Sequence, residues 1–348
     1  MAVVGLTHEP ASLYSNRMSD RKIRWGILGV ARINDRLLPS FKKAGNLELH
    51  GIASRTLAKA QDAAQAAGIP KAYGSYDALL DDPNIDVVYN PLPNSLHAEW
   101  TRKAAERGKH VLCEKPLTPT AGEAADLVAF CRDKKIALMD GFMWPHHPRT
   151  ALLKRYLTDG NIGPVRRIEG AFTFQLPELD PRNIRLQADL GGGSLLDVGC
   201  YPVYGIRWAM GEEPIRAWAT AHIEHGCDVE MSGVLWFAGG RMATFDCGFT
   251  HPLRQWLEIT GSSGIVHVHD MWLPPKRAIF EVRREGSYDV ECHAVEGQDQ
   301  IQHMLENFSR AVQTRTPVLP PPDEAVKTLR VLDALAKSAR VGHAVDVQ

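Results

Sequence analysis

The chain has 348 residues and a mass of 38.5 kDa, which exceeds one ordinary hydrophobic core and suits two domains. Lysine and arginine number 40 and aspartate and glutamate 41, so the formal net charge is −1. This balance gives no support to a nucleic-acid or membrane partner, and it makes a small molecule the expected partner. The six cysteines form no CxxC pair, which predicts reduced thiols and a cytoplasmic protein without structural disulfides.

The first part of the chain alternates short apolar strands with helices. Residues 1–20 contain no signal-peptide core and are expected to be a flexible N-terminal extension. The predicted strands are 23–28, 47–53, 85–89, 110–113 and 136–142, and the predicted helices are 33–44, 57–67, 76–80, 97–107 and 120–134. Strands that are apolar throughout and separated by helices predict a parallel sheet covered on both faces. Residues 21–144 are therefore predicted to be a doubly wound Rossmann domain.

The sequence pattern changes near residue 145. After a predicted helix at 148–158, strand-like runs follow at 165–174, 215–223, 231–237, 242–249, 256–260, 265–269 and 278–283. Glycine turns such as 238–240 predict antiparallel hairpins. Helices are expected at 301–313 and 323–341. The fold class is thus predicted as α/β, with a C-terminal α+β domain over 145–348 that carries a large, mostly antiparallel sheet.

The turn after the first strand occupies the place of a dinucleotide fingerprint. Gly29 fits the tight turn that this fingerprint needs, but Ala31 and Asn34 replace its second and third glycines. An ordinary strand–turn–helix is the alternative for such a degraded motif, and its position after the first strand favours a dinucleotide site. The expected contacts to the cofactor pyrophosphate are Gly29, Val30, Ala31, Arg32 and Ile33.

The end of the second strand bears on the choice of cofactor. An NAD site usually places an acidic residue there, whereas this chain has Ser54, Arg55 and Thr56. A guanidinium with hydroxyl donors suits the dianionic 2′-phosphate of NADP. The alternative is a helix N-cap beside a solvated arginine, and the two interpretations are compatible. We predict that Ser54 and Arg55 bind NADP, with NAD as a possible second cofactor.

Three further motifs together resemble one known family. They are the PNSLH turn at 93–97, EKP at 114–116 and GGGSLLDVG at 191–199. This set is similar to the Gfo/Idh/MocA (glucose–fructose oxidoreductase, inositol dehydrogenase and rhizopine-catabolism) family of NAD(P)-dependent oxidoreductases, from about residue 23 to 344. The resemblance implies a sugar, polyol or related cyclic alcohol as substrate and a homodimer or homotetramer assembled through the C-terminal sheet. It also implies cofactor contacts from Pro91, Leu92, Asn94, His97, Glu114 and Lys115.

Lys115 follows a predicted parallel strand, at the sheet edge where doubly wound folds bind ligands. A lysine there can donate to a substrate hydroxyl and stabilise negative charge while the C–H bond gives up hydride. We therefore expect Lys115 to contact both cofactor and substrate and to act in catalysis. Without the neighbouring motifs, an exposed lysine beside a turn would be the better interpretation.

The segment 197–201 holds the second chemical cluster. Many members of the resembled family read DxGxHxxD with a proton-transferring histidine, whereas this chain has Tyr201 at that position and Tyr204 at the final one. It resembles the tyrosine branch, which includes xylose and dihydrodiol dehydrogenases. We expect Tyr201 to remove the hydroxyl proton, with its pKa lowered by Lys115, and Asp197 to bind or orient the substrate or Lys115. A core aromatic is the alternative for Tyr201.

Other residues leave alternatives open. Arg185 is expected to donate to sugar hydroxyls, with a solvated loop arginine as the alternative. Trp144 either covers the cofactor or packs between the domains. The histidine pairs lack a third ligand at a typical spacing, so no metal is expected. Two rival functions remain at this point: a non-catalytic nucleotide-sensing regulator on the same fold, and a glycosidase that works through a transient oxidation.

Overall fold

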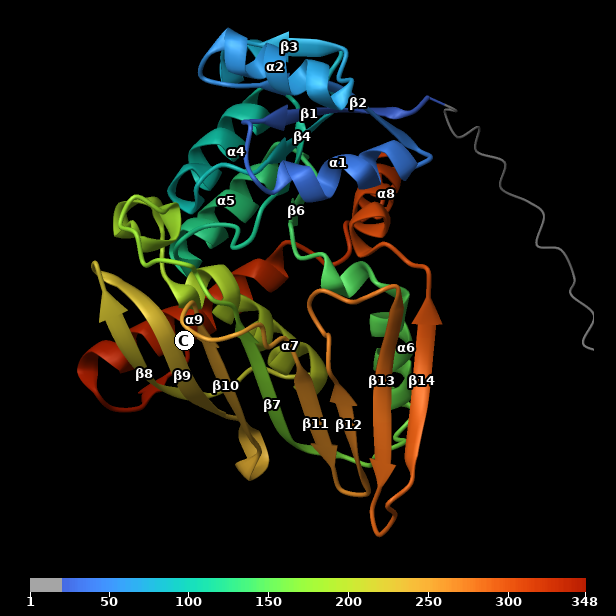
Figure 1. Ribbon diagram of the computed structural model, residues 1–348, viewed down its shortest axis with the longest axis vertical. Helices are drawn as coiled ribbons and strands as arrows, with labels where there is room; N and C mark the ends of the chain where they lie inside the picture. Colours follow the sequence, from blue (N-terminus) through green and yellow to red (C-terminus); the bar gives the residue numbers. More distant parts are fainter. Residues whose placement is uncertain (1–20) are drawn as a thin grey trace, which may run out of the picture.

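The computed structural model describes residues 21–348, so the expected extension at 1–20 lies outside the described residues. Within 21–348 the strands form two separate sheets (Figure 1). The first has the order β3-β2-β1-β4-β5-β6, and all of its neighbouring strands are parallel. Its strands are β1 Ile23–Leu28, β2 Leu47–Ala53, β3 Lys71–Tyr73, β4 Val87–Asn90, β5 His110–Cys113 and β6 Leu138–Asp140. This order confirms the predicted doubly wound sheet.

Helices cover both faces of the parallel sheet. They are α1 Asn34–Lys43, α2 Leu57–Ala67, α3 Tyr76–Leu80, α4 His97–Glu106, α5 Ala121–Asp133 and, from much later in the chain, α8 Gln300–Thr314. Trp25 in β1 is fully buried and meets Phe308 of α8 edge to face, and its indole Nε1 donates to Ser309 Oγ at 3.0 Å. The C-terminal part of the chain therefore returns to complete the N-terminal core.

The second sheet has the order β14-β13-β12-β11-β7-β10-β9-β8-β15 within the described residues. Its strands are β7 Val165–Thr173, β8 Arg216–Glu224, β9 Cys227–Trp236, β10 Met242–Gly248, β11 Leu257–Gly261, β12 Gly264–Val268, β13 Arg277–Arg284, β14 Val290–Glu296 and β15 Val345–Asp346. The pair β7 and β10 is parallel and the other neighbours are antiparallel. The predicted large, mostly antiparallel sheet is confirmed.

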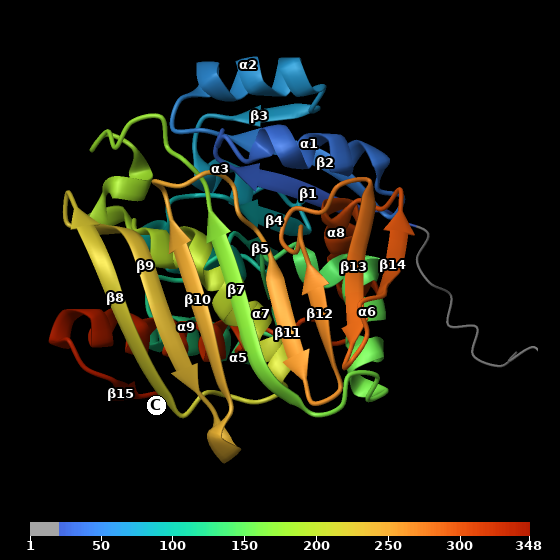
Figure 2. The same cartoon turned by 60° about the horizontal axis from the view of Figure 1, so that its bottom comes forward.

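Only one face of this sheet is covered by helices. Figure 2 shows α6 (Pro148–Thr158), α7 (Cys200–Met210) and α9 (Asp323–Val341) behind it, while the opposite face is open. The covered face and the helices share one hydrophobic core with one face of the parallel sheet, through residues such as Val88, Val111 and Leu138. In the part of the chain from 21 to 348, no helix combines the length and apolar character needed to cross a membrane.

The structure contains elements that the sequence patterns did not predict. β3 and β15 have three and two residues, too few for a recognisable period. β14 is an edge strand whose side chains are mostly exposed, so it has no buried face to reveal it. α7 was missed because Pro202 and Gly205 are poor helix formers. Gly205 is nevertheless required, since an added Cβ would lie 2.5 Å from the Trp272 ring.

Candidate active site

A tight turn connects β1 to α1 at the carboxyl edge of the parallel sheet. Gly29 has φ +104°, and an added Cβ would lie 3.2 Å from a methyl carbon of Leu92, so glycine is required. Asn34, at the position of the third fingerprint glycine, donates from Nδ2 to Gly29 O at 2.9 Å and closes the turn. The amide N–H groups of residues 30–33 donate to no acceptor in residues 21–348. Four free amides before a ten-residue helix form an anion-binding cradle.

The end of β2 lies beside this turn. Ser54 is buried, whereas Arg55 is exposed and forms no ion pair with any residue that the structure describes. Thr56 occupies the N-cap of α2 without a side-chain capping bond, so the capping alternative is not realised. The sequence patterns missed Tyr76, whose hydroxyl lies 3.6 Å from where a Gly29 Cβ would be. Burial raises the pKa of Tyr76 and the nearby Arg55 charge opposes that rise, so the two side chains lie near each other.

The turn after β4 is held by buried hydrogen bonds. The ring of His97 is fully buried, with Nδ1 2.9 Å from Pro116 O and Nε2 2.7 Å from Leu92 O. Burial lowers the pKa of His97 to about 4, although the two carbonyls act in the opposite direction. The expected direct cofactor contact of His97 is therefore corrected, because both ring nitrogens face main-chain carbonyls. His97 instead ties the turn that carries Pro91 and Leu92 to the EKP turn.

Two further hydrogen bonds hold the turn after β4 in place. Asn90, which the sequence analysis missed, is fully buried and accepts from the Leu92 amide at 3.3 Å. Asn94 donates from Nδ2 to Gly191 O at 2.8 Å. The predicted cofactor residue Asn94 thus also holds the glycine-rich loop of the C-terminal part against the nucleotide side.

Glu114 positions the chain at the end of β5. Its Oε1 accepts from the Tyr89 hydroxyl at 2.5 Å, and its Oε2 accepts from the Lys115 amide at 3.3 Å. Burial raises the pKa of Glu114, and the adjacent Lys115 charge partly offsets that rise. The Lys115–Pro116 peptide bond is cis. Glu114 therefore fixes the main chain from which Lys115 extends.

The structure brings Lys115, Asp197 and Arg185 together. Lys115 Nζ donates to the Asp197 main-chain carbonyl at 2.6 Å and to its Oδ1 at 3.0 Å, while Arg185 Nε donates to Oδ2 at 2.6 Å. Burial alone would lower the pKa of Lys115, but the nearby Asp197 and Tyr201 reverse that effect, so the pKa rises. The pKa of Asp197 falls to about 2 because the two cations outweigh its burial. The solvated-loop alternative for Arg185 is wrong, since the side chain is ion-paired.

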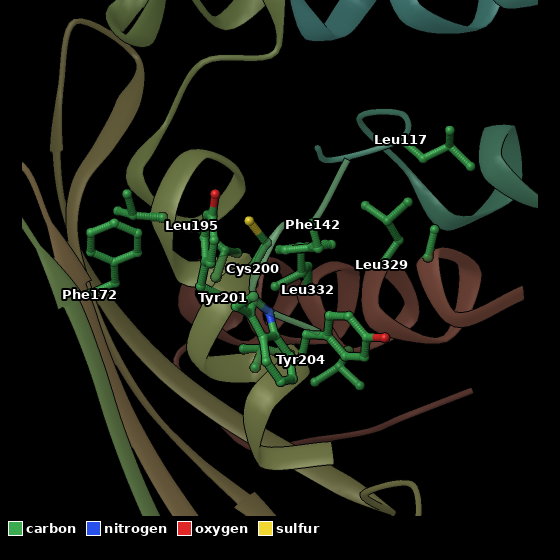
Figure 3. Close-up of a cluster of buried hydrophobic side chains, with 14 of the residues drawn as sticks. Leu117, Phe142, Phe172, Leu195, Cys200, Tyr201, Tyr204, Leu329 and Leu332 are labelled. Atoms are coloured by element: carbon green, nitrogen blue, oxygen red, sulfur yellow. The ribbon is translucent and has the colours of Figure 1, made fainter. Parts of the chain in front are cut away.

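Tyr201 lies beside Lys115, whose Nζ is 5.1 Å from the ring centroid. The ring is 4% exposed and meets Phe142 and Phe172 edge to face, each at 5.0 Å. Its hydroxyl forms no hydrogen bond with any described residue, and Figure 3 shows it pointing away from the Tyr204 hydroxyl. Burial raises the pKa of Tyr201 more than Lys115 lowers it, so the expected net lowering is wrong for the protein alone.

Asp228 of β9 is a site residue that sequence patterns did not reveal. Its Oδ2 accepts from Ser194 Oγ at 2.7 Å and from the Leu195 amide at 2.6 Å. These bonds anchor the start of the π-helical turn Leu195–Gly199, which carries Asp197. The partners are more than 30 residues apart in the chain, so no local motif marks them.

Trp144 has a structural role. Trp144 is fully buried and contacts the rings of Tyr204, Trp208 and Trp272, so it packs between elements rather than covering a cofactor. In the described part of the chain, no group of three or more histidine, cysteine, aspartate or glutamate side chains is placed to hold a metal ion.

Comparisons with known proteins agree with this geometry. The model of the oxidoreductase family with an NAD-binding Rossmann fold matches residues 23–142, and that of the GFO/IDH/MocA C-terminal domain matches 150–267. The chain is 38% identical over 325 residues to D-xylose 1-dehydrogenase (NADP(+)) 2 of Haloferax volcanii, covering 93% of this chain and 99% of that protein.

Two solved structures are also similar. A 3-ketoreductase from Actinomadura kijaniata, in complex with NADP and TDP-benzene, has a TM-score of 0.85 at 31% identity and covers 91% of this chain and 98% of its own. An aldose–aldose oxidoreductase from Caulobacter crescentus, complexed with glycerol, has a TM-score of 0.86 at 27% identity, with coverages of 94% and 100%.

Proposed function

The chain belongs to the GFO/IDH/MocA family of NAD(P)-dependent oxidoreductases, and we propose that it transfers a hydride between NADP and a hydroxyl-bearing carbon of an uncharged sugar or polyol. The observation that carries this proposal is the placement of Lys115 and Tyr201 together at the carboxyl edge of the parallel sheet. In this arrangement, residues 21–144 hold the nucleotide and residues 145–348 present the alcohol to it.

The nucleotide end suits NADP. The four free amides of residues 30–33 can receive the pyrophosphate, and the unpaired Arg55 guanidinium can receive a 2′-phosphate. When bound, the nicotinamide takes up or returns the hydride. Gly29, Leu92 and Asn94 shape the wall along which such a cofactor lies.

Tyr201 and Lys115 have different roles at the alcohol end of the site, where the substrate hydroxyl would bind. The unengaged Tyr201 hydroxyl exchanges a proton with the substrate oxygen, and Lys115 stabilises the negative charge that develops there. The raised pKa keeps the phenol protonated, which suits donation of a proton to a carbonyl being reduced. Asp197 holds Lys115 in place by an ion pair and is itself paired with Arg185, and these side chains offer donors and acceptors to sugar hydroxyls.

The charge of the substrate-side loop favours an uncharged substrate over a nucleotide-linked sugar. The loop 175–193 contains two arginines, and both are paired: Arg182 with Asp180 at 2.7 Å and Arg185 with Asp197 at 2.6 Å. Its three acidic residues outnumber them, so 2 − 3 gives a formal charge of −1. A diphosphate would meet repulsion and find no free arginine in this loop. We therefore expect this chain to differ in substrate from the ketoreductase relative, whose structure contains TDP-benzene.

The test is a comparison of the parent and Tyr201→Phe with NADP and NAD across free aldoses, polyols and a dTDP-sugar. We expect the parent to turn over free sugars, and we expect the variant to lose about 10²–10⁴-fold in turnover while its NADP affinity stays within about twofold. Normal turnover in Tyr201→Phe would remove Tyr201 from the mechanism. Tight NADP binding without any hydride transfer by the parent would favour the nucleotide-sensing regulator.

The assembly proposed here is a homodimer or homotetramer formed through the open face of the nine-stranded sheet. That face has a shallow hollow lined in part by the partly exposed Trp218, Val234 and Trp256. Partly exposed tryptophans suit an interface between copies of the chain. Light scattering of the purified protein is expected to give twice or four times the mass of one chain, and a monomer would contradict this assembly.

A further inference from the structure

A second cavity lies at the opposite edge of the parallel sheet from Lys115. It has a volume of about 790 Å³ and is lined by the first residues of β5 and β6, by the ends of α5 and α8, and by the segment 315–323. Parallel strands place their amino ends together, so this cavity is distinct from the site at their carboxyl ends. Its volume falls within the range of about 300–1,000 Å³ that small-molecule sites occupy.

The interior of the cavity is apolar. Val128 and Cys131 of α5, Leu138 of β6, Ala311 of α8 and Val318 line it, and all five are less than 9% exposed. An apolar wall of this kind favours an aryl ring or an alkyl chain. The interior of the cavity therefore suits the apolar part of a ligand.

Cations surround the same cavity. Lys135 and Arg315 end helices α5 and α8 in the left-handed conformation, with φ of +59° and +55°. Neither forms an ion pair with a residue in the described range 21–348. Arg132 also lines the cavity but is bound to both carboxylate oxygens of Asp323 at 3.0 Å. Three cations against one carboxylate leave a formal charge of +2 among the lining residues.

A neutral donor adds to this charge. His110 Nδ1 accepts from the Ala137 amide at 2.9 Å, so a neutral ring carries its proton on Nε2. That N–H has no acceptor among the described residues. Burial lowers the pKa of His110, which keeps the ring in this neutral form.

From these features we propose that the cavity binds a small amphipathic carboxylate, with its aryl or alkyl body against the apolar wall and its carboxylate near Lys135, Arg315 and His110. An apolar interior with unpaired cations at its edge matches that class in both shape and charge. A ligand there touches α5, α8 and the segment 315–323 that joins α8 to α9. This site goes beyond the proposed function and does not depend on it.

The test uses the full chain saturated with NADP, so that the nucleotide site is filled. The probe is the fluorescent anion 8-anilinonaphthalene-1-sulfonate, displaced by octanoate or phenylacetate and by the neutral octanol. We expect octanoate to displace the probe at about tenfold lower concentration than octanol does. Equal potency of octanoate and octanol would overturn the role of the cations.

Variants locate the binding. Lys135→Asn and Arg315→Asn remove the charges while keeping a residue that tolerates the left-handed conformation, so the helix ends are preserved. The double variant is expected to bind octanoate about tenfold more weakly, and Lys59→Asn on α2 is the matched control that leaves binding unchanged. Ala311→Trp, which fills the cavity, is expected to abolish displaceable binding. Unchanged octanoate affinity in the double variant, or in a folded Ala311→Trp, would overturn the proposal.

Discussion

The two ends of the proposed active site are built from different materials. The nucleotide end consists mainly of main-chain amides in the turn at 30–33, together with the exposed cation Arg55. The alcohol end consists of partly buried side-chain charges, in which Asp197 holds both Lys115 and Arg185. The main-chain cradle depends on backbone direction, so it tolerates Ala31 and Asn34 in place of glycines. The charged cluster depends on the identity of its members, because removal of one leaves a partly buried partner without its counter-charge.

The largest expected effect of this difference follows from Lys115→Met, which keeps the length of the side chain and removes its charge. Turnover is expected to fall by about 10³-fold, because developing charge on the substrate oxygen loses its stabilising cation. NADP affinity is expected to change by no more than a few-fold, since the proposed pyrophosphate contacts are main-chain amides. Steady-state kinetics and nucleotide titration measure the two effects, with the exposed Lys42→Met on α1 as the matched control. A proportionate loss of NADP affinity would show that the two ends are not independent.

Arg55→Ala tests the one side chain on which the nucleotide end is expected to depend. NADP affinity is expected to fall by about 10–100-fold, because a charge-assisted contact to the 2′-phosphate is lost. NAD affinity is expected to stay nearly constant, since NAD lacks that phosphate. Titration of both nucleotides against the variant measures the ratio, and Arg36→Ala on the exposed side of α1 serves as the control. An unchanged NADP-to-NAD ratio would assign the preference to other residues.

The difference between main-chain and side-chain contacts also explains which features could be predicted from the sequence. The Rossmann sheet was predictable because its strands are apolar throughout, and Gly29 marks its own turn through an obligatory positive φ. Lys115, Asp197 and Tyr201 were predictable because they stand in motifs of a known family. Asp228 and Asn90 could not be predicted in this way. Their side chains accept hydrogen bonds from the Leu195 and Leu92 amides, and no sequence motif indicates these contacts.

Some predicted roles failed for physical reasons. His97 lies in the expected motif, but both nitrogens of its buried ring face main-chain carbonyls. At this position the motif therefore indicates a residue that holds two turns together. The direction of the Tyr201 pKa was mispredicted because the sequence shows the neighbouring charge of Lys115 and not the cost of desolvation around the ring. Motifs therefore predict which residues belong to the site, while the environments of those residues had to come from the three-dimensional packing.

The smallest expected effect concerns the segment near residue 145 that joins the two predicted domains. There a histidine side chain accepts a hydrogen bond from a main-chain amide at the start of a helix. His147 caps α6 by accepting from the Arg149 amide at Nδ1, at 3.0 Å, and the ring is 1% exposed. Burial, assisted by the Arg149 charge, lowers the pKa of His147 to about 4. In the unfolded chain the pKa is about 6.5, so the unfolded state binds a proton first as the pH falls. The free energy of unfolding therefore decreases between about pH 6.5 and pH 4.

His147→Asn separates capping from titration, because asparagine is a good N-cap and does not ionise. The loss of unfolding free energy between about pH 7 and pH 5 is expected to be smaller in the variant by about 2 kcal/mol. Urea unfolding at the two pH values measures this difference. His97 and His146 also have pKa values lowered to about 4 by burial, so part of the acid sensitivity is expected to persist. An identical pH dependence in parent and variant would show that folding does not change the protonation of His147.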